Sequence, residues 1–218
     1  MTKKEKIVFI TNELRRLYPD SKCSLTYSKP YELLIATRLS AQCTDERVNK
    51  VTPELFKKYP SLEAFANADF DDVCNIIHSC GFYRGKAKSI IEMSNQIIND
   101  FGGIVPDNIE DLIKLSGIGR KTANLICGDI YGKPAIIADT HCIRLSGRLG
   151  LTNSKDPKVV ELTLKKIIPA DEQTKLCHNF VFHGRAVCNA RNPDCLNCTL
   201  NSVCSFYTST KQQSKKKS

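Results

Sequence analysis

The sequence has no run of about 18 apolar residues, so no segment is expected to cross a membrane. Its first residues, MTKKEKIVFI, contain only four consecutive apolar residues, too few for the core of a secretory signal. No stretch alternates apolar and polar residues for more than a few positions, and no internal repeat is visible. We therefore expect a cytoplasmic protein without strands, and a monomer by default.

A disulfide framework is also disfavoured, because the 11 cysteines are odd in number and no secretory signal precedes them. Most of the scattered cysteines are interpreted as small buried hydrophobic residues. These are Cys23, Cys43, Cys74, Cys80, Cys127, Cys142 and Cys177. The remaining four fall within one short stretch, CNARNPDCLNCTLNSVC.

The charge is positive, with a formal net value of +9 and a pI near 9.0. Such an excess suggests a polyanionic partner such as nucleic acid. Four of the positive charges lie in the tail 211–218, KQQSKKKS, which we expect to be disordered. The signal from the body of the chain is therefore moderate, and the tail alone could serve only solubility.

Apolar residues recur at helical spacing along nearly the whole chain, which predicts an all-α fold. In the first helix, one apolar face comprises Ile7, Ile10, Leu14 and Leu17. Further helical segments are expected over 30–43, 48–60, 61–81, 85–103, 109–132, 139–150, 156–170 and 174–188. The segment 109–132 is expected to be two helices separated by SGIG.

The stretch LSGIGRKTA, 115–123, predicts a hairpin that binds a DNA phosphate. Gly117 and Gly119 permit backbone conformations and close approaches that other residues do not. The N-terminus of the following helix supplies unpaired N–H groups and partial positive charge. The alternative is an ordinary packing corner between two helices that binds nothing.

Two side chains near this hairpin are candidates for catalysis. Lys121 lies just inside the second helix, where the helix N-terminus and burial would both destabilise its ammonium form, as an amine nucleophile requires. It could instead be a solvated surface lysine. Asp139, in IIADTHC, could be a helix N-cap, a catalytic carboxylate, or both.

The four clustered thiols, Cys188, Cys195, Cys198 and Cys204, have the spacing C-x6-C-x2-C-x5-C and predict a metal centre. Zinc sites usually show two C-x2-C pairs, whereas iron–sulfur clusters are larger and tolerate uneven loops. The spacing by itself leaves both metals open. A pair of structural disulfides is the remaining alternative.

Taken together, these motifs resemble the endonuclease III family of helix–hairpin–helix DNA glycosylases and abasic-site lyases. The resemblance covers about residues 5–207 and is carried by LSAQCTD, LSGIGRKTAN, ADTH, HGRAVC and the cysteine spacing, in the family's order. It implies two helical domains with a DNA groove between them. The domain 23–134 would carry the hairpin, and 1–22 with 135–210 would carry a 4Fe-4S cluster.

The resemblance also implies the roles of individual residues. Lys121 would be the nucleophile, with Asp139 as its carboxylate partner. Gln42 would fill the space left by an extruded nucleotide, and Phe82 would act as an apolar wedge on the other side. Further DNA contacts would come from Leu115, Gly117, Gly119, Arg120, Thr122, His141, Arg144 and Arg191, and the four clustered cysteines would ligate the iron.

The implied activity is removal of oxidised or ring-saturated pyrimidines from double-stranded DNA, followed by nicking of the abasic site through a Schiff base on Lys121. The sequence departs from the family at Cys43, usually Ala or Thr, at Cys142, usually aliphatic, and at Phe82, often a smaller apolar residue. Two alternatives remain. One is the related adenine mismatch glycosylase, which normally lacks the lysine; the other is a non-catalytic DNA-binding module with a structural zinc.

Overall fold

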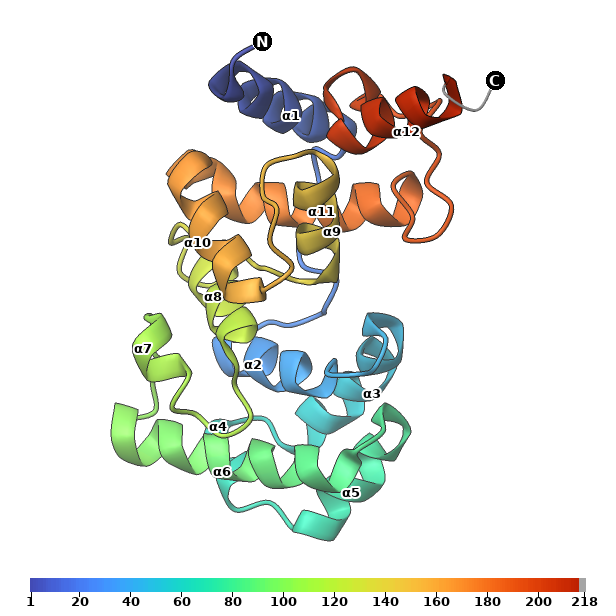
Figure 1. Ribbon diagram of the computed structural model, residues 1–218. Coiled ribbons are helices and arrows are strands. Elements are labelled where there is room, and N and C mark those ends of the chain that lie inside the picture. Colours follow the sequence, from blue (N-terminus) through green and yellow to red (C-terminus); the bar gives the residue numbers. More distant parts are fainter. Residues whose placement is uncertain (216–218) are drawn as a thin grey trace. The chain divides into compact units, whose positions relative to one another are not determined.

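The computed structural model describes the backbone of residues 1–215 and the side chains of residues 1–210. All regular secondary structure in this part of the chain is helical, which confirms the all-α fold. The chain divides into two compact units (Figure 1). One is the continuous segment Cys23–Lys133, and the other joins Met1–Lys22 to the chain from Pro134 onward.

The unit Cys23–Lys133 is built around α6, which packs against α2, α4 and α5. Its helices are α2 (Pro30–Leu39), α3 (Asp45–Lys58), α4 (Leu62–Ala66), α5 (Phe70–Ile77), the 3-10 turn η1 (His78–Cys80), α6 (Tyr83–Phe101), α7 (Ile109–Leu112) and α8 (Arg120–Asp129). The hairpin helices α7 and α8 contact each other, and α8 packs on α2. The hairpin therefore packs on the helical core of its own unit through α2.

The segment 61–81, expected as one helical stretch, is divided into α4, α5 and η1. The division occurs because Asp69 begins a new helix: its Oδ1 accepts a hydrogen bond from the Asp72 amide at 2.8 Å. Phe65 on α4 is fully buried, and the rings of Tyr31 and Tyr59 pack around it. The aromatic contacts therefore pack α4 against α2 and the end of α3.

The second unit is organised around α11, which contacts both α1 and α9. Its helices are α1 (Lys3–Leu17), α9 (Thr140–Arg148), α10 (Pro157–Ile167), η2 (Ala170–Glu172), α11 (Gln173–Ala186), η3 (Asn201–Val203) and α12 (Ser205–Lys215). On α1, the predicted apolar face is buried at Ile7, Ile10 and Leu14, whereas Leu17 is half-buried. The terminal helix thus docks on the segment that leads to the cysteine stretch.

The backbone of α12 is helical through Lys215, inside the 211–218 tail for which disorder is expected. Lys and Gln are good helix formers, so a helix that begins at Ser205 can continue into the tail. Residues 216–218 lie outside the described part of the chain. Within residues 1–215, none of the helices combines the length and apolar character that a membrane span needs.

Candidate active site and cysteine pocket

The hairpin between α7 and α8 requires glycine at one of its two glycine positions. Gly117 has φ +75°, and a Cβ built there would lie 2.5 Å from Nε of Arg38 and 2.9 Å from Cβ of Ser89. Both the backbone conformation and the close approach of α2 and α6 therefore exclude a side chain. The turn is held against the core of its unit by this contact.

Gly119 differs from this, because its φ of −98° is open to any residue and a Cβ there would meet no atom within 4 Å. The conformational freedom expected of it from the sequence is not used. Gly119 is the N-cap of α8 and offers no side-chain cap to the helix. No cap side chain therefore covers the amide groups in the first turn of α8. Such an arrangement suits the binding of an anion.

Lys121 is exposed in the first turn of α8. The burial expected for it from the sequence is not found. Its electrostatic neighbours lie in the same unit. Burial raises the pKa of the Cys23 thiol to about 11, with Asp129 and Asp45 raising it further and the Lys121 ammonium lowering it. One amine and two carboxylates thus act electrostatically on the Cys23 thiol.

Around the rest of the hairpin, Leu115 is buried, while Arg120 and Thr122 are half-buried. The Leu115 side chain belongs to the core, so only its backbone could meet DNA. The Ile118 amide donates to the Leu115 carbonyl at 3.1 Å, which closes the turn. The sequence motif therefore combines core residues with residues at the surface.

Asp139 is the N-cap of α9, as one interpretation of the sequence predicted. Its Oδ1 accepts a hydrogen bond from the Cys142 amide at 2.7 Å, and its side chain is half-buried. The apolar segment before it, 135–138, is buried and holds the cap residue in place. The cap engages one carboxylate oxygen, which does not exclude a chemical role for the group.

Gln42 and Phe82 have an unusual backbone conformation in common. Their φ angles are 56° and 48°, and they are the non-glycine residues with positive φ within residues 1–215. A left-handed conformation outside glycine costs about 1–3 kcal/mol and is commonly found at functional sites. Both side chains are exposed, and Phe82 keeps 73% of its surface accessible. An exposed, strained aromatic residue has no role in the core.

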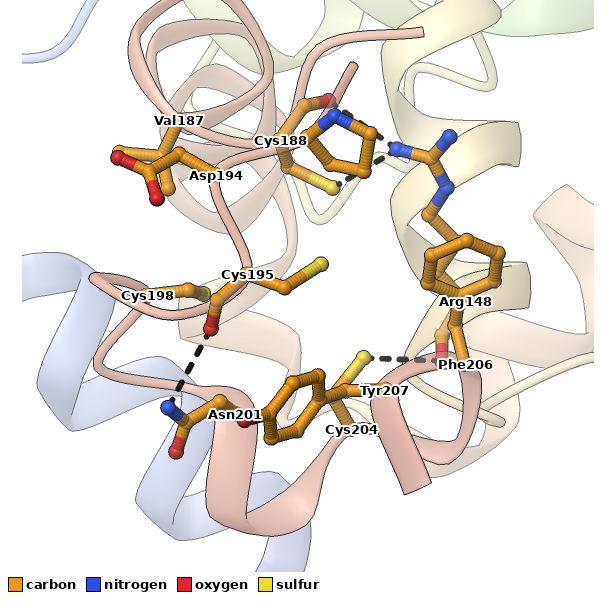
Figure 2. A pocket seen from close by; sticks show the side chains of 11 residues that line it. Arg148, Val187, Cys188, Asp194, Cys195, Cys198, Asn201, Cys204, Phe206 and Tyr207 are labelled. Atoms are coloured by element: carbon orange, nitrogen blue, oxygen red, sulfur yellow. Dashed lines mark hydrogen bonds between the residues drawn. The ribbon is translucent and has the colours of Figure 1, made fainter. Parts of the chain in front are cut away.

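The four clustered cysteines line one pocket of about 280 Å³, part of which is open to solvent. In Figure 2 the sulfur atoms of Cys188, Cys195 and Cys204 point into the same space. No disulfide joins the cysteines, so that alternative is not supported within the described residues. No three His, Cys, Asp or Glu residues in 1–210 are placed to hold a single metal ion.

Arg148, at the end of α9, binds the loop that carries the first of these cysteines. Its guanidinium donates to the carbonyls of Asn189 and Ala190 at 2.7 and 2.8 Å. It also donates to Sγ of Cys188 at 3.2 Å (Figure 2). The guanidinium also lies over the Phe206 ring, 4.8 Å from its centroid. A planar group with several donors suits this task, because one side chain can bind successive carbonyls.

Arg144 and His141 join α9 to the same region. Arg144 donates to the carbonyls of Cys188 and Gly184, each at 3.2 Å, and its Nη2 lies 3.0 Å from Nδ1 of His141. A Cβ on Gly184 would lie 2.4 Å from Nδ1 of His141, so HGRAVC requires its glycine for this approach. Arg144 is thus engaged within the protein, whereas Arg191 is exposed on the cysteine loop.

His183 supports the pocket from α11. It is 2% exposed, its Nδ1 lies 3.1 Å from the Tyr18 hydroxyl, and its Nε2 lies 3.4 Å from Sγ of Cys198. Burial lowers the pKa of His183. No role was predicted from the sequence for His183 or Arg148. His183 lies in HGRAVC, beside the first clustered cysteine, whereas Arg148 is 40 residues from Cys188 and has no local signal. Together they orient two of the four sulfurs.

The chemistry of the thiols fits an iron–sulfur cluster. Burial raises the pKa values of Cys195 and Cys198, and charge on the neighbouring thiols raises them further. Four thiolates would therefore repel one another here unless a cationic centre offsets their charge. The four cysteines line one pocket, and a centre of several metal atoms tolerates their uneven spacing along the chain.

The two units define a helix–hairpin–helix protein with a four-cysteine pocket near its C-terminus. Residues 35–170 match the family described as HhH-GPD superfamily base excision DNA repair protein. The chain belongs to this superfamily and, within it, to the endonuclease III family, as the resemblance predicted.

Two curated relatives named Endonuclease III are similar over nearly their full length. The protein of Synechocystis sp. is 47% identical over 204 residues, covering 93% of each chain. The protein of Bacillus subtilis is 42% identical over 201 residues, covering 92% of each chain. A solved structure described as a trapped endonuclease III–DNA covalent intermediate superimposes with a TM-score of 0.89 and 40% identity, covering 97% of this chain and 100% of the other.

Proposed function

We propose that this protein is a DNA base-excision repair enzyme that removes oxidised or ring-saturated pyrimidines and then nicks the resulting abasic site. The family membership and the relatives named Endonuclease III support the glycosylase and lyase activities. The observation that carries the proposal is Lys121, exposed in the first turn of α8 directly after the hairpin. An amine at this position supplies the nucleophile that a covalent intermediate with DNA requires.

The proposed reaction begins with extrusion of the damaged nucleotide, which costs a few kcal/mol and is easiest for damaged bases. Gln42 and Phe82 would fill the vacated space. Their exposure and their left-handed backbone conformation support this role. The first turn of α8 and Arg191 would hold the DNA backbone through phosphate contacts.

Neutral Lys121 would then attack the sugar C1′, and the C1′–N bond to the base would break with the electron pair leaving on the base. Asp139 would stabilise the positive charge that builds on the sugar and help to move protons. Ring opening gives a Schiff base between Lys121 and C1′. This imine acidifies the C2′ protons, and loss of one expels the 3′ phosphate by β-elimination.

For the cofactor, we propose that Cys188, Cys195, Cys198 and Cys204 hold a 4Fe-4S cluster. When bound, the cluster supplies a rigid cross-link of the loop and neutralises the four thiolates. Arg148 and His183 orient two of the sulfurs through the contacts described above. The chain's own residues then present Arg191 from a fixed loop toward the DNA backbone.

The test is borohydride trapping on a duplex that contains one thymine glycol. Wild-type protein should form a permanent cross-link, because borohydride reduces the imine to an amine, and Lys121→Gln should form none. Lys88→Gln is the matched control, since Lys88 is an exposed lysine of the same unit that pairs with Glu92. Loss of base without any cross-link would show that water is the nucleophile and would refute the lyase mechanism.

An abasic-site duplex in the same experiment separates substrate choice from activity. Trapping on the abasic site but not on thymine glycol would overturn the proposed lesion class and keep the lyase. Binding without trapping or base loss on either duplex would indicate a non-catalytic binding module instead.

A further inference from the structure

The two loops assigned to fill the DNA gap each carry a cysteine. Cys43 directly follows Gln42 in the connection between α2 and α3, and Cys80 ends η1 two residues before Phe82. Both loops belong to the unit Cys23–Lys133. The strained backbone positions of this unit are therefore adjacent to two thiols.

A buried lysine joins the bases of the two loops. Lys86, in the first turn of α6, is 1% exposed, and its Nζ donates to the carbonyls of Leu39 and Cys80, each at 2.8 Å. Leu39 ends α2, so one ammonium group binds the last carbonyl of that helix and the last carbonyl of η1. The two loops consequently leave the core side by side.

The Cys43 and Cys80 side chains interact directly with each other. Cys80 is 2% exposed, and burial together with the neighbouring Cys43 raises its pKa to about 11. Cys43 is only half-buried, and it is the member of the pair that solvent can reach. Lys86 and Arg47 face the pair as cations. The geometry places an accessible thiol beside a protected one.

We propose that Cys43 and Cys80 are a redox modification site, at which a hydroperoxide forms a reversible disulfide between the two insertion loops. The functional meaning of this bond rests on the proposed function, because that function assigns Gln42 and Phe82 to the DNA gap. Disulfide formation itself rests on the junction of the two loops at Lys86 and on the different exposure of the two thiols.

The chemistry proceeds in two steps and needs only a hydroperoxide as oxidant. The Cys43 sulfur attacks hydrogen peroxide and breaks the O–O bond, giving a sulfenic acid and one water. The Cys80 sulfur then attacks the Cys43 sulfur, and the S–O bond breaks with release of a second water. Two thiols are oxidised, one peroxide is reduced, and both thiol protons leave in water.

The disulfide would restrain the movement of both insertion loops. A sulfur–sulfur bond of about 2.05 Å is shorter than a contact between thiols, so Cys43 and Cys80 must approach each other. Gln42 and Phe82 would move with them. Misplacement of positioning groups by about 1 Å can cost roughly a hundredfold in rate, so we expect slower processing of damaged duplex by about ten- to a hundredfold.

A second pair of interacting thiols provides an internal comparison. Cys142 and Cys177 contact each other in the other unit, and the Ile137 amide donates to Sγ of Cys177 at 3.2 Å. Their exposed fractions are 0% and 3%, so neither thiol offers the access that Cys43 has. We expect this pair to stay reduced under conditions that oxidise the Cys43–Cys80 pair.

The experiment treats the cluster-loaded protein with hydrogen peroxide, blocks the remaining thiols by alkylation, and maps disulfides after trypsin digestion. Cys43 falls in peptide 39–47, and Cys80 falls in peptide 59–84 together with Cys74. The Cys74→Ala background therefore makes the assignment unique. Cleavage of a thymine glycol duplex is measured in parallel, before oxidation, after oxidation, and after reduction with a phosphine.

The proposal expects a linked 39–47/59–84 peptide in Cys74→Ala and none in Cys74→Ala/Cys43→Ala. It also expects slower cleavage that the phosphine restores and that Cys43→Ala does not show. Cys43 over-oxidised without a link, a link with unchanged cleavage, or equal inactivation of Cys43→Ala would each overturn it. A link in a protein that is inactive when reduced would support the modification site and refute the proposed function.

Discussion

A side chain on Gly117 would collide with Arg38, whose Nε lies 2.5 Å from the position that a Cβ would take. The same guanidinium group is held in place, because its Nη2 donates to Oγ of Ser89 at 3.2 Å. The guanidinium therefore cannot withdraw without losing this bond. The shape of the hairpin is consequently set by residues of α2 and α6 as well as by its own sequence.

Replacing Gly117 by Ala should destabilise the protein by about 1–3 kcal/mol, because the new Cβ adds a clash to a left-handed backbone. Gly119→Ala is the matched control. Its φ of −98° and open surroundings predict a change within about 0.5 kcal/mol. Chemical denaturation of both variants measures the difference. Equal destabilisation would show that the Arg38 contact does not restrict the turn.

Asp139 can be tested separately as a cap and as a carboxylate. Asp139→Asn keeps a good N-cap for the Cys142 amide but removes the charge, so stability should be retained while borohydride trapping slows by about 10²–10⁴-fold. Asp139→Ala should lose the cap as well, at about 0.5–2 kcal/mol. Trapping by Asp139→Asn at the wild-type rate would leave the residue with the cap role alone.

Arg148 and Arg191 should separate retention of the proposed cluster from DNA binding. Arg148→Lys removes the planar group that donates to Asn189, Ala190 and Cys188, so iron should be lost faster to a chelator, as followed by the visible absorption of the cluster. Arg191→Ala should retain iron and lower the slope of log binding constant against log salt by about 1. Iron loss from both variants alike would contradict this division.

Lys86→Met should orphan the buried carbonyls of Leu39 and Cys80, costing about 1–3 kcal/mol for each. Burial lowers the pKa of Lys86 from 10.5. The unfolded chain therefore binds more protons than the folded one between the lowered value and 10.5, and the stability from this group rises with pH across that window. Denaturation of wild type and variant over this alkaline range measures the effect. If the difference in free energy of unfolding between wild type and variant stayed constant across this pH range, the lowered pKa of Lys86 would be refuted.

Much of the helical architecture could be predicted from the sequence. The buried face of α1 at Ile7, Ile10 and Leu14 follows from spacing alone, since the helical period is local. The break at Asp69 was missed, because the apolar pattern of 61–81 continues on both sides of it. The helical backbone of α12 beyond Thr210 was missed because composition describes the average behaviour of a tail and not its attachment to a preceding helix.

The all-α class, the hairpin motif and the four-thiol stretch follow from the amino-acid sequence, because each depends on residues that are close neighbours along the chain. Which distant groups meet depends on the packing of the helices. The contact of Arg38 with Gly117, the donation from Lys86 to Leu39, and the interaction between Cys43 and Cys80 join segments far apart in sequence. Such contacts depend on how packed helices bring their ends together, and no local period encodes that arrangement.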